Sequence, residues 1–291
     1  MMWQCYRYFI NDWISLFYID KIFLFKYYGF SWVNPILGNG MYWVFGILTL
    51  SSFLVMIGCF YRVAIISLFI SFGYIFLLDE ARYLNHFYLV LLIAFLMCFV
   101  DANRVYSIDA RRKKLINCIP YWQLFSLILM LEIMLLYAGV VKIQTDWLSG
   151  LPLSKWLSSR TNTPIIGSLL DKDWVHLLAS YLSIAIHVFG APLLLFKKTR
   201  VWMFFIYAIF HGLNSIFFNI GIFPLLTLSA TTLFLAPNWP QKFIISRQCS
   251  KQDFRINLKF KLISIILVVF FLTQLLLPVR HFFYPGNVLW T

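Results

Sequence analysis

The 291-residue sequence predicts an all-α protein, a polytopic bundle of about eight transmembrane helices with no large extramembrane domain. Three observations lead to this fold class. Hydrophobic residues make up 62% of the chain and charged residues only 12%, whereas a soluble domain carries about a quarter charged residues. Long apolar segments recur along the chain, and basic residues gather between them. The bilayer, rather than water, is therefore the solvent for most of the chain.

The first forty residues do not fit a membrane span. Residues 13–25 are interrupted by Asp20 and Lys21, and they mix Trp, Tyr and Phe with basic side chains. Amphipathic segments of this composition lie in the plane of the membrane interface. We therefore predict an interfacial helix over 13–25 within an N-terminal segment 1–40, followed by a transmembrane bundle over 41–291.

Eight segments come close to the roughly 20 apolar residues that a membrane span needs. They are residues 41–60, 63–78, 87–100, 121–141, 175–196, 201–220, 222–236 and 262–279. Residues 87–100 and 222–236 are short for complete spans, so each is also compatible with a re-entrant or partial segment.

The distribution of Lys and Arg agrees with this number of spans. One set of alternate loops holds fifteen of the 24 basic residues, namely Arg62, Arg104, Arg111, Arg112, Lys113, Lys114, Lys197, Lys198, Arg200, Lys242, Arg247, Lys251, Arg255, Lys259 and Lys261. Cytoplasmic loops collect Lys and Arg, so both chain ends are predicted to lie outside. The net charge of +13 follows from this topology, and no nucleic-acid-binding motif accompanies it.

The cysteines and histidines do not predict a metal site. Five cysteines are scattered without a Cys-x-x-Cys pair: Cys5, Cys59, Cys98, Cys118 and Cys249. We expect neither a disulfide framework nor a thiolate site. Histidines in separate spans would suit a metal or haem, but no His-x-x-x-His or Glu-x-x-His spacing supports this.

Ionisable side chains at membrane depth are the candidates for function, because each costs free energy unless it is paired or faces water. They are His86, Glu132, Lys142, Asp146, His187, His211 and His281, with Asn85, Asn214 and Asn219 as amide neighbours. In the predicted topology His86, Lys142, Asp146 and His281 all lie near the outer face. This convergence predicts a shared site there.

Lys142 has two interpretations. A lysine at a helix end is commonly a snorkelling anchor. Three features favour function instead: the residue lies on the outer side, it follows the small pair Ala138 and Gly139, and an Asp-Trp pair lies one turn further on. A lysine base must be uncharged, and burial in an apolar bundle lowers the pKa of an amine. His86 would then accept or relay the proton.

The other candidates are balanced between structure and function. Glu132 lies about 15 Å along a helix from Lys142, and a protonated carboxyl bonded to a neighbouring helix is at least as common as a catalytic one. His187 is more often a satisfied interhelical hydrogen-bonder than a ligand. His211 and Asn214 share one helix face and would line a polar cavity.

Four strings contain most of these polar residues: 76–89 (FLLDEARYLNHFYL), 101–109 (DANRVYSID), 137–147 (YAGVVKIQTDW) and 210–221 (FHGLNSIFFNIG). In this order, and with the polar residues in register, they resemble the membrane domain of vitamin K-dependent gamma-carboxylase. They are equally similar to its relatives, the horizontally transferred transmembrane (HTTM) family. The resemblance runs from about residue 23 to residue 290.

The resemblance implies a reaction and a set of residues. In the carboxylase a lysine deprotonates reduced vitamin K, which reacts with oxygen to give a strong base. That base removes a γ-proton from a glutamate, to which carbon dioxide adds. The resemblance implies that Lys142 and His86 are catalytic, as base and tuning histidine. Asn85, His211 and Asn214 would bind the quinol, and no metal is implied.

By the same resemblance, the chain is expected to be a multi-pass enzyme of the cell membrane, or inner membrane in a bacterium, with its active site toward the outer face. Its co-substrates would be reduced vitamin K or another membrane quinol, O2 and CO2. Its partners would be lipid and a glutamate-containing peptide or a separate peptide-binding subunit, and not nucleic acid.

The sequence departs from the carboxylase in three respects. The sequence ends at Thr291, where the carboxylase continues into a large extramembrane domain, it is expected to lack the family's first helix, and Val141 stands where the carboxylase has the first of two adjacent lysines. The alternative is therefore a non-catalytic HTTM partner that helps to mature or export a peptide. A transporter would show inverted repeats, and the sequence has no such repeat.

Overall fold

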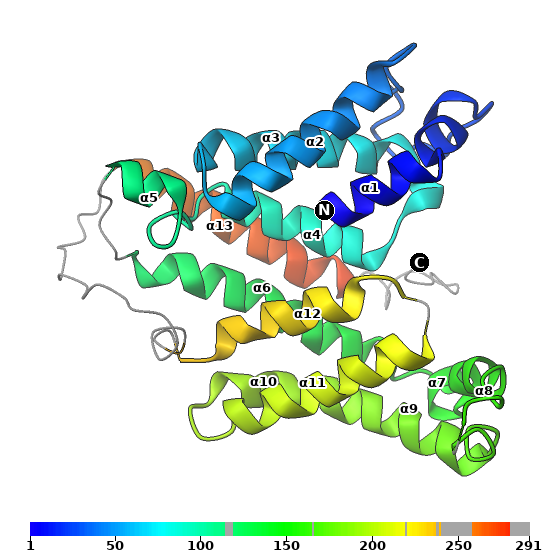
Figure 1. Cartoon of the computed structure of the whole chain (residues 1–291). Coiled ribbons are helices and arrows are strands. Elements are labelled where there is room, and N and C mark those ends of the chain that lie inside the picture. Colours follow the sequence, from blue (N-terminus) through cyan, green and yellow to red (C-terminus); the bar gives the residue numbers. More distant parts are fainter. Residues whose placement is uncertain (114–118, 165, 219, 237–238, 240–257, 280–291) are drawn as a thin grey trace. The chain divides into compact units, whose positions relative to one another are not determined.

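The computed structural model describes residues 1–113, 119–164, 166–218, 220–236, 239 and 258–279. These residues form helices and no strand, which confirms the all-α class (Figure 1). The chain divides into two compact units. The first comprises Met1–Leu124 with Arg247–Ser264 and Pro285–Thr291, and the second comprises Phe125–Ser246 with Ile265–Tyr284.

Helices α2 and α3 pack together in the first unit, with α1 against α2 and α4 against α3. The helical elements described there are α1 (Met2–Ile10), η1 (Ser15–Ile19), α2 (Gly40–Ile57), α3 (Tyr61–Leu78), η2 (Glu80–Arg82), α4 (Asn85–Met97) and α5 (Ile108–Lys113). Their apolar core includes Cys5, Tyr8, Tyr18, Phe45, Leu48, Phe72 and Ile75. The N-terminal segment therefore contributes side chains to the core of this unit.

The turn from α2 to α3 shows how local sequence shapes this unit. Gly58 ends α2 with a φ of +63°, and a Cβ atom there would lie 2.3 Å from the Cβ of Ser107, so only glycine fits. The Asp109 carboxylate accepts hydrogen bonds from the backbone N–H groups of Phe60 (3.1 Å) and Tyr61 (3.0 Å). It thereby satisfies donors that the start of α3 leaves unpaired.

The predicted helix over 13–25 is only partly correct. Helical structure within this range ends at Ile19, and a separate helix, α1, precedes it. Beyond Ile19, Lys21 forms an ion pair of 2.5 Å with Asp79, and the same carboxylate accepts the N–H of Phe25 at 3.0 Å. These long-range contacts replace helical hydrogen bonds. The interfacial location of residues 1–40 and the domain boundary at residue 40 stay predictions.

The second unit contains most of α6 (Tyr121–Val140), then α7 (Thr145–Leu148), α8 (Leu151–Ser158), α9 (Asp173–Val188), α10 (Gly190–Leu195), α11 (Arg200–Phe217), α12 (Phe223–Thr231), η3 (Thr232–Phe234) and the end of α13 (Leu258–Leu276). The predicted span 175–196 is divided between α9 and α10, with Phe189 between them. Helix α11 packs against α10 and α12, and α9 packs against α7, α8 and α10.

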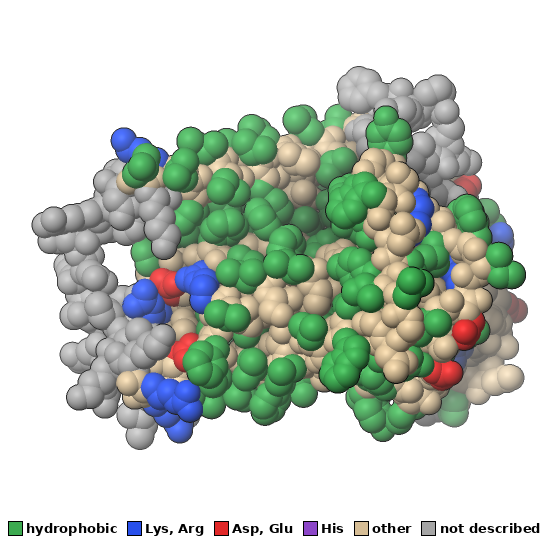
Figure 2. All heavy atoms as spheres, turned by 90° about the horizontal axis from the view of Figure 1, so that it is seen from above, with side chains coloured by type: hydrophobic (Ala, Val, Ile, Leu, Met, Phe, Trp, Pro, Cys, Tyr) green, Lys and Arg blue, Asp and Glu red, His purple; other side chains and the backbone are tan. Residues whose placement is uncertain are grey.

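Each predicted span overlaps a helix. Helices α2, α3, α6 and α11 are long and apolar enough to cross a membrane, and Asn85–Met97, Phe223–Phe234 and Phe260–Leu276 are shorter apolar helices. Large apolar side chains stay exposed on the spans, as on Trp43 of α2 (73%) and Val63 of α3 (71%). Figure 2 shows such side chains over much of one face, as expected of a lipid-facing surface. The total of eight spans and their sidedness stay predictions.

Candidate functional site

Lys142 lies two residues beyond the end of α6, in the turn that leads to α7. Its ammonium nitrogen is 5.3 Å from the centre of the Trp147 ring. Among the residues that the structure describes, the side chain of Lys142 has no ion pair and no hydrogen bond. Burial without a counter-charge lowers the pKa of Lys142 to about 8. An appreciable fraction of this amine is therefore uncharged near neutral pH.

Helix α9 approaches α6 closely at Gly139. A Cβ atom at Gly139 would lie 2.8 Å from the Cβ of His187, so only glycine allows this approach. Further along, the hydroxyl of Ser180 donates a hydrogen bond to the carbonyl of Trp147. The two contacts show that α9 runs antiparallel to the segment from α6 to α7. They bring His187 beside the last turn of α6, next to Lys142.

The hydrogen bonds of two buried histidines fix their tautomers. His187, 5% exposed, donates from Nδ1 to the carbonyl of Ser183 at 2.7 Å, which leaves Nε2 with a lone pair. His211, 2% exposed, has Nδ1 3.3 Å from the hydroxyl of Thr227. That hydroxyl donates to the carbonyl of Phe223 at 2.9 Å, so it accepts the Nδ1–H of His211. Both rings thus present Nε2 as an acceptor.

Lys142, His187 and His211 form one electrostatic group, which we call the Lys–His cluster. The charge of Lys142 acts on both imidazole rings, and His211 acts on His187. Tyr207 packs 5.9 Å from each imidazole ring, edge-on to His187 and stacked on His211. Phe210 lies 5.1 Å from the first and 5.3 Å from the second. The cluster is therefore a polar group enclosed by aromatic rings.

The chemistry available to the cluster is that of a base and hydrogen-bond acceptors. Nε2 of His211 is buried and has no hydrogen-bond partner within the described part of the chain. In the same part, no three His, Cys, Asp or Glu side chains gather as they would around a metal ion. One amine with a lowered pKa and two imidazole lone pairs can instead receive O–H donors from an aromatic ligand.

Of the predicted site residues, His211 and Lys142 belong to the Lys–His cluster. The other predicted residues lie elsewhere or outside the described part of the chain. Asn214 is partly buried on α11 and has no side-chain hydrogen bond among the described residues. Asn85, which is exposed, and His86, which is partly buried beside Phe87, begin α4 in the first unit. The pairing of His86 with Lys142 stays a prediction. Asn219 and His281 lie outside the described residues.

One sequence-based interpretation needs correction. His187 bonds the carbonyl four residues earlier on its own helix, and not a neighbouring helix as expected. For Glu132 both the structural and the catalytic role stay open, and its Oε2 is buried without a hydrogen-bond partner among the described residues. Sequence reasoning also missed Thr227 and Tyr207. His187 could be identified from the sequence, because it is a histidine within an apolar segment. Thr227 could not, because no local pattern connects it to His211.

A family model, the HTTM domain, matches residues 1–239 of the chain. No solved structure matches it. The matched region includes all three members of the Lys–His cluster and the pair Asn85 and His86. With 239 of 291 residues covered, the chain belongs to the HTTM domain family.

Proposed function

We propose that this HTTM protein is a membrane enzyme of the gamma-carboxylase type, in which Lys142 is the base that deprotonates a membrane quinol. The observation that carries the proposal is the Lys–His cluster, where an amine that has no counter-charge among the described residues lies close to two buried imidazoles. Membership of the HTTM family and the four sequence strings support the same chemistry. The assignment of His86 as the tuning histidine rests on the resemblance.

The residues of the cluster fit a reduced naphthoquinone. Such a molecule has two O–H donors and a flat apolar ring. The unpartnered Nε2 of His211 is an acceptor for one hydroxyl, and the neutral amine of Lys142 is an acceptor for the other. Trp147 and Phe210 supply aromatic surfaces near these two acceptors.

The chain's own contribution to the reaction is to move and hold a proton. The amine of Lys142 takes the proton of a bound hydroxyl and becomes an ammonium. The Nε2 lone pair of His187 is then the acceptor that lowers the energy of that ammonium, while Nε2 of His211 holds the other hydroxyl. Aromatic rings exclude water, which would otherwise quench reactive species. The quinol supplies the reducing equivalents for O2, and CO2 is the second co-substrate for carboxylation of a glutamate-containing acceptor.

The direct test uses purified protein in lipid nanodiscs with a reduced naphthoquinone and oxygen, and measures the epoxide by chromatography. We expect epoxide from the wild type and only background from Lys142→Ala. Lys155→Ala is the matched control, since Lys155 is an exposed lysine of α8 in the same unit. Equal epoxide formation by the wild type and Lys142→Ala would refute the proposed base.

The acceptor is tested in cells. Mass spectra of membrane peptides are compared with and without the protein, and a gain of the mass of CO2 on glutamate is expected only when Lys142 is present. If cells carrying both His86→Ala and Lys142→Ala keep full function, and the protein is found in an obligate complex, it is a non-catalytic partner in peptide maturation or export.

A further inference from the structure

The segment between η1 and α2, residues 20–39, has a fixed course beside the end of α3. The carboxylate of Asp79, the residue after α3, accepts the backbone N–H of Phe25 at 3.0 Å. Further along the segment, the hydroxyl of Tyr74 donates a hydrogen bond of 2.6 Å to the carbonyl of Asn34. These bonds join both halves of the segment to the same helix end, so its exposed side chains belong to a defined surface.

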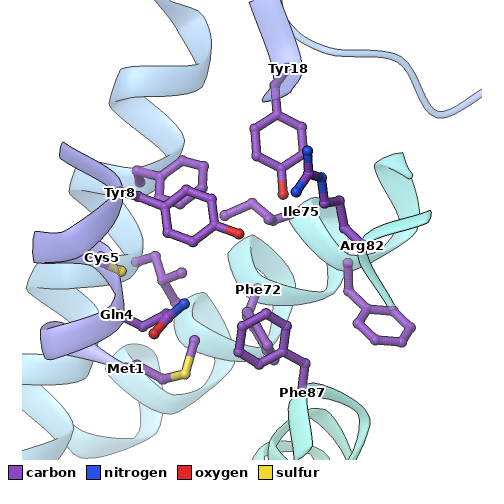
Figure 3. A pocket seen from close by; sticks show the side chains of 12 residues that line it. Met1, Gln4, Cys5, Tyr8, Tyr18, Phe72, Ile75, Arg82 and Phe87 are labelled. Atoms are coloured by element: carbon purple, nitrogen blue, oxygen red, sulfur yellow. The ribbon is translucent and has the colours of Figure 1, made fainter. Parts of the chain in front are cut away.

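The residues before this segment are part of the core of the first unit. In Figure 3, Tyr8 of α1 and Tyr18 of η1 point into a pocket that Phe72 and Phe87 also line. The two tyrosine hydroxyl groups form a hydrogen bond with each other. The pocket holds about 30 Å³, which is room for one or two water molecules. Residues 20–39 therefore extend from tightly packed structure on their N-terminal side.

The charged side chains of the segment all have partners within the first unit. Lys21 forms its ion pair with Asp79, and Lys26 donates a hydrogen bond to a backbone carbonyl of the segment itself. Asp20 accepts a hydrogen bond of 2.7 Å from the hydroxyl of Ser15. The sequence of the segment contains no other charged residue. Its surface therefore offers no unpaired charge to a partner.

The segment also exposes large apolar and aromatic side chains. Ile22 and Tyr28 are fully exposed, and Leu37 is 93% exposed. The others are Phe23, Phe25, Phe30, Trp32 and Ile36. Loops in water normally carry polar side chains, and apolar side chains gathered on a fixed segment mark an interaction surface. We call this surface, residues 22–37, the apolar loop.

Lipid is the partner that the neighbouring helix indicates. Helix α2 begins at Gly40, shortly after the apolar loop, and is long and apolar enough to cross a membrane. Exposed apolar side chains continue along the chain from Leu37 in the apolar loop to Trp43 and Ile47 on α2. The 18 residues of α2 extend over about 27 Å, close to the roughly 30 Å of a bilayer's hydrocarbon core. The start of α2, and the apolar loop before it, therefore lie at one edge of that core.

We propose that the apolar loop is inserted into the bilayer, where its side chains contact the glycerol region and the upper acyl chains of the lipids. Aromatic side chains such as Tyr28 and Trp32 favour this zone. The contact needs no anionic headgroup, because both lysines of the segment are already engaged. A protein partner would require polar contacts at the rim of the interface, and the charged side chains are not free to make them. The membrane contact thus belongs to an anchored loop rather than to the helix expected over 13–25, and it does not depend on the chemistry proposed for Lys142.

The test places a fluorescent coumarin amino acid at position 28 of the full chain, in phosphatidylcholine nanodiscs. Fluorescence is quenched either by a nitroxide on the upper acyl chain of the lipid or by iodide in the water. We expect the nitroxide to quench position 28 about twofold more strongly than iodide does, because the side chain lies at the boundary of headgroups and acyl chains. The same replacement at Tyr106 is the matched control, since Tyr106 is another exposed tyrosine of the first unit, in the charged loop of Asp101 and Arg104. There iodide should quench more strongly.

Three results would overturn the proposal. Stronger quenching by iodide at position 28 would mean that the apolar loop lies in water. Protection from both quenchers would indicate a protein partner in place of lipid. Nitroxide quenching that appears only with anionic lipid, and that high salt abolishes, would contradict a contact made by apolar side chains. If the protein labelled at Tyr28 does not fold, the label is placed at Leu37, which is also exposed, and the same outcomes decide.

Discussion

Lys21 in the first unit and Lys142 in the second have opposite surroundings. The nitrogen of Lys21 is 2.5 Å from the carboxylate of Asp79, whose side chain is fully buried. Lys142 lies 5.3 Å from the centre of the Trp147 ring, at the end of α6 where His187 packs, and no carboxylate pairs with it among the described residues. A carboxylate favours the ammonium form and holds distant parts of the chain together, whereas burial without a paired carboxylate favours the free amine. The charge of the neighbour, more than the residue type, distinguishes a structural lysine from a candidate base.

The largest expected effect is on stability. Asp79→Ala should lower the free energy of unfolding by about 3 kcal/mol, because it removes the ion-pair partner of Lys21 and leaves the N–H of Phe25 without an acceptor. Lys142→Met should leave the free energy of unfolding unchanged or raise it, since the variant removes a buried amine that has no counter-charge within the described part of the chain. Thermal unfolding in detergent measures both variants. Equal losses in the two would contradict the comparison.

The second effect concerns the close approach of α6 and α9. Gly139→Ala should destabilise the protein by about 2 kcal/mol and reduce activity, because the added Cβ displaces His187 from the turn that carries Lys142. Gly46→Ala on α2 is the control, since a Cβ there meets nothing within 4 Å and alanine favours helix. Unfolding and epoxide assays on both variants provide the measurement. An alanine tolerated equally at both positions would show that α9 is not held by this contact.

The third expectation is a pH profile. The base acts as the free amine, and the pKa of Lys142 is about 8, so the epoxidation rate should fall about tenfold for each pH unit below 8 and level off above it. Initial rates between pH 6 and pH 10 at constant ionic strength give the midpoint. A rate independent of pH over this range would exclude Lys142 as the titrating base.

The smallest expected effect comes from giving Lys142 a carboxylate neighbour, as Lys21 has in the first unit. His187→Glu places a carboxylate near Lys142, which should stabilise the ammonium and move the midpoint of the pH profile up by about one unit. His187→Gln is the uncharged control and should not produce this upward shift. The midpoints of the two variants are compared under identical conditions. The same midpoint in both would mean that residue 187 does not act on the base.

Much of the fold was predictable from local patterns. Within the described residues, apolar segments predicted each helix of more than eight residues except α1. The end of η1 at Ile19 was not predictable, because Lys21 is held by Asp79, 58 residues further on. The break between α9 and α10 was also missed, because the apolar segment continues through it, although Gly190 and Pro192 are local signals of a break.

The sequence by itself determined the all-α class and the location of the apolar helices, and it singled out Lys142 and His211 as candidates, because hydropathy and rare ionisable groups are local properties of the chain. Only the tertiary structure decided that His187 belongs with them. That residue reaches the cluster because Gly139 lets α9 approach α6, and His211 is oriented by a threonine sixteen residues away on α12. Contacts between distant residues depend on how helices pack, and packing is decided by the shapes of whole surfaces rather than by any single segment.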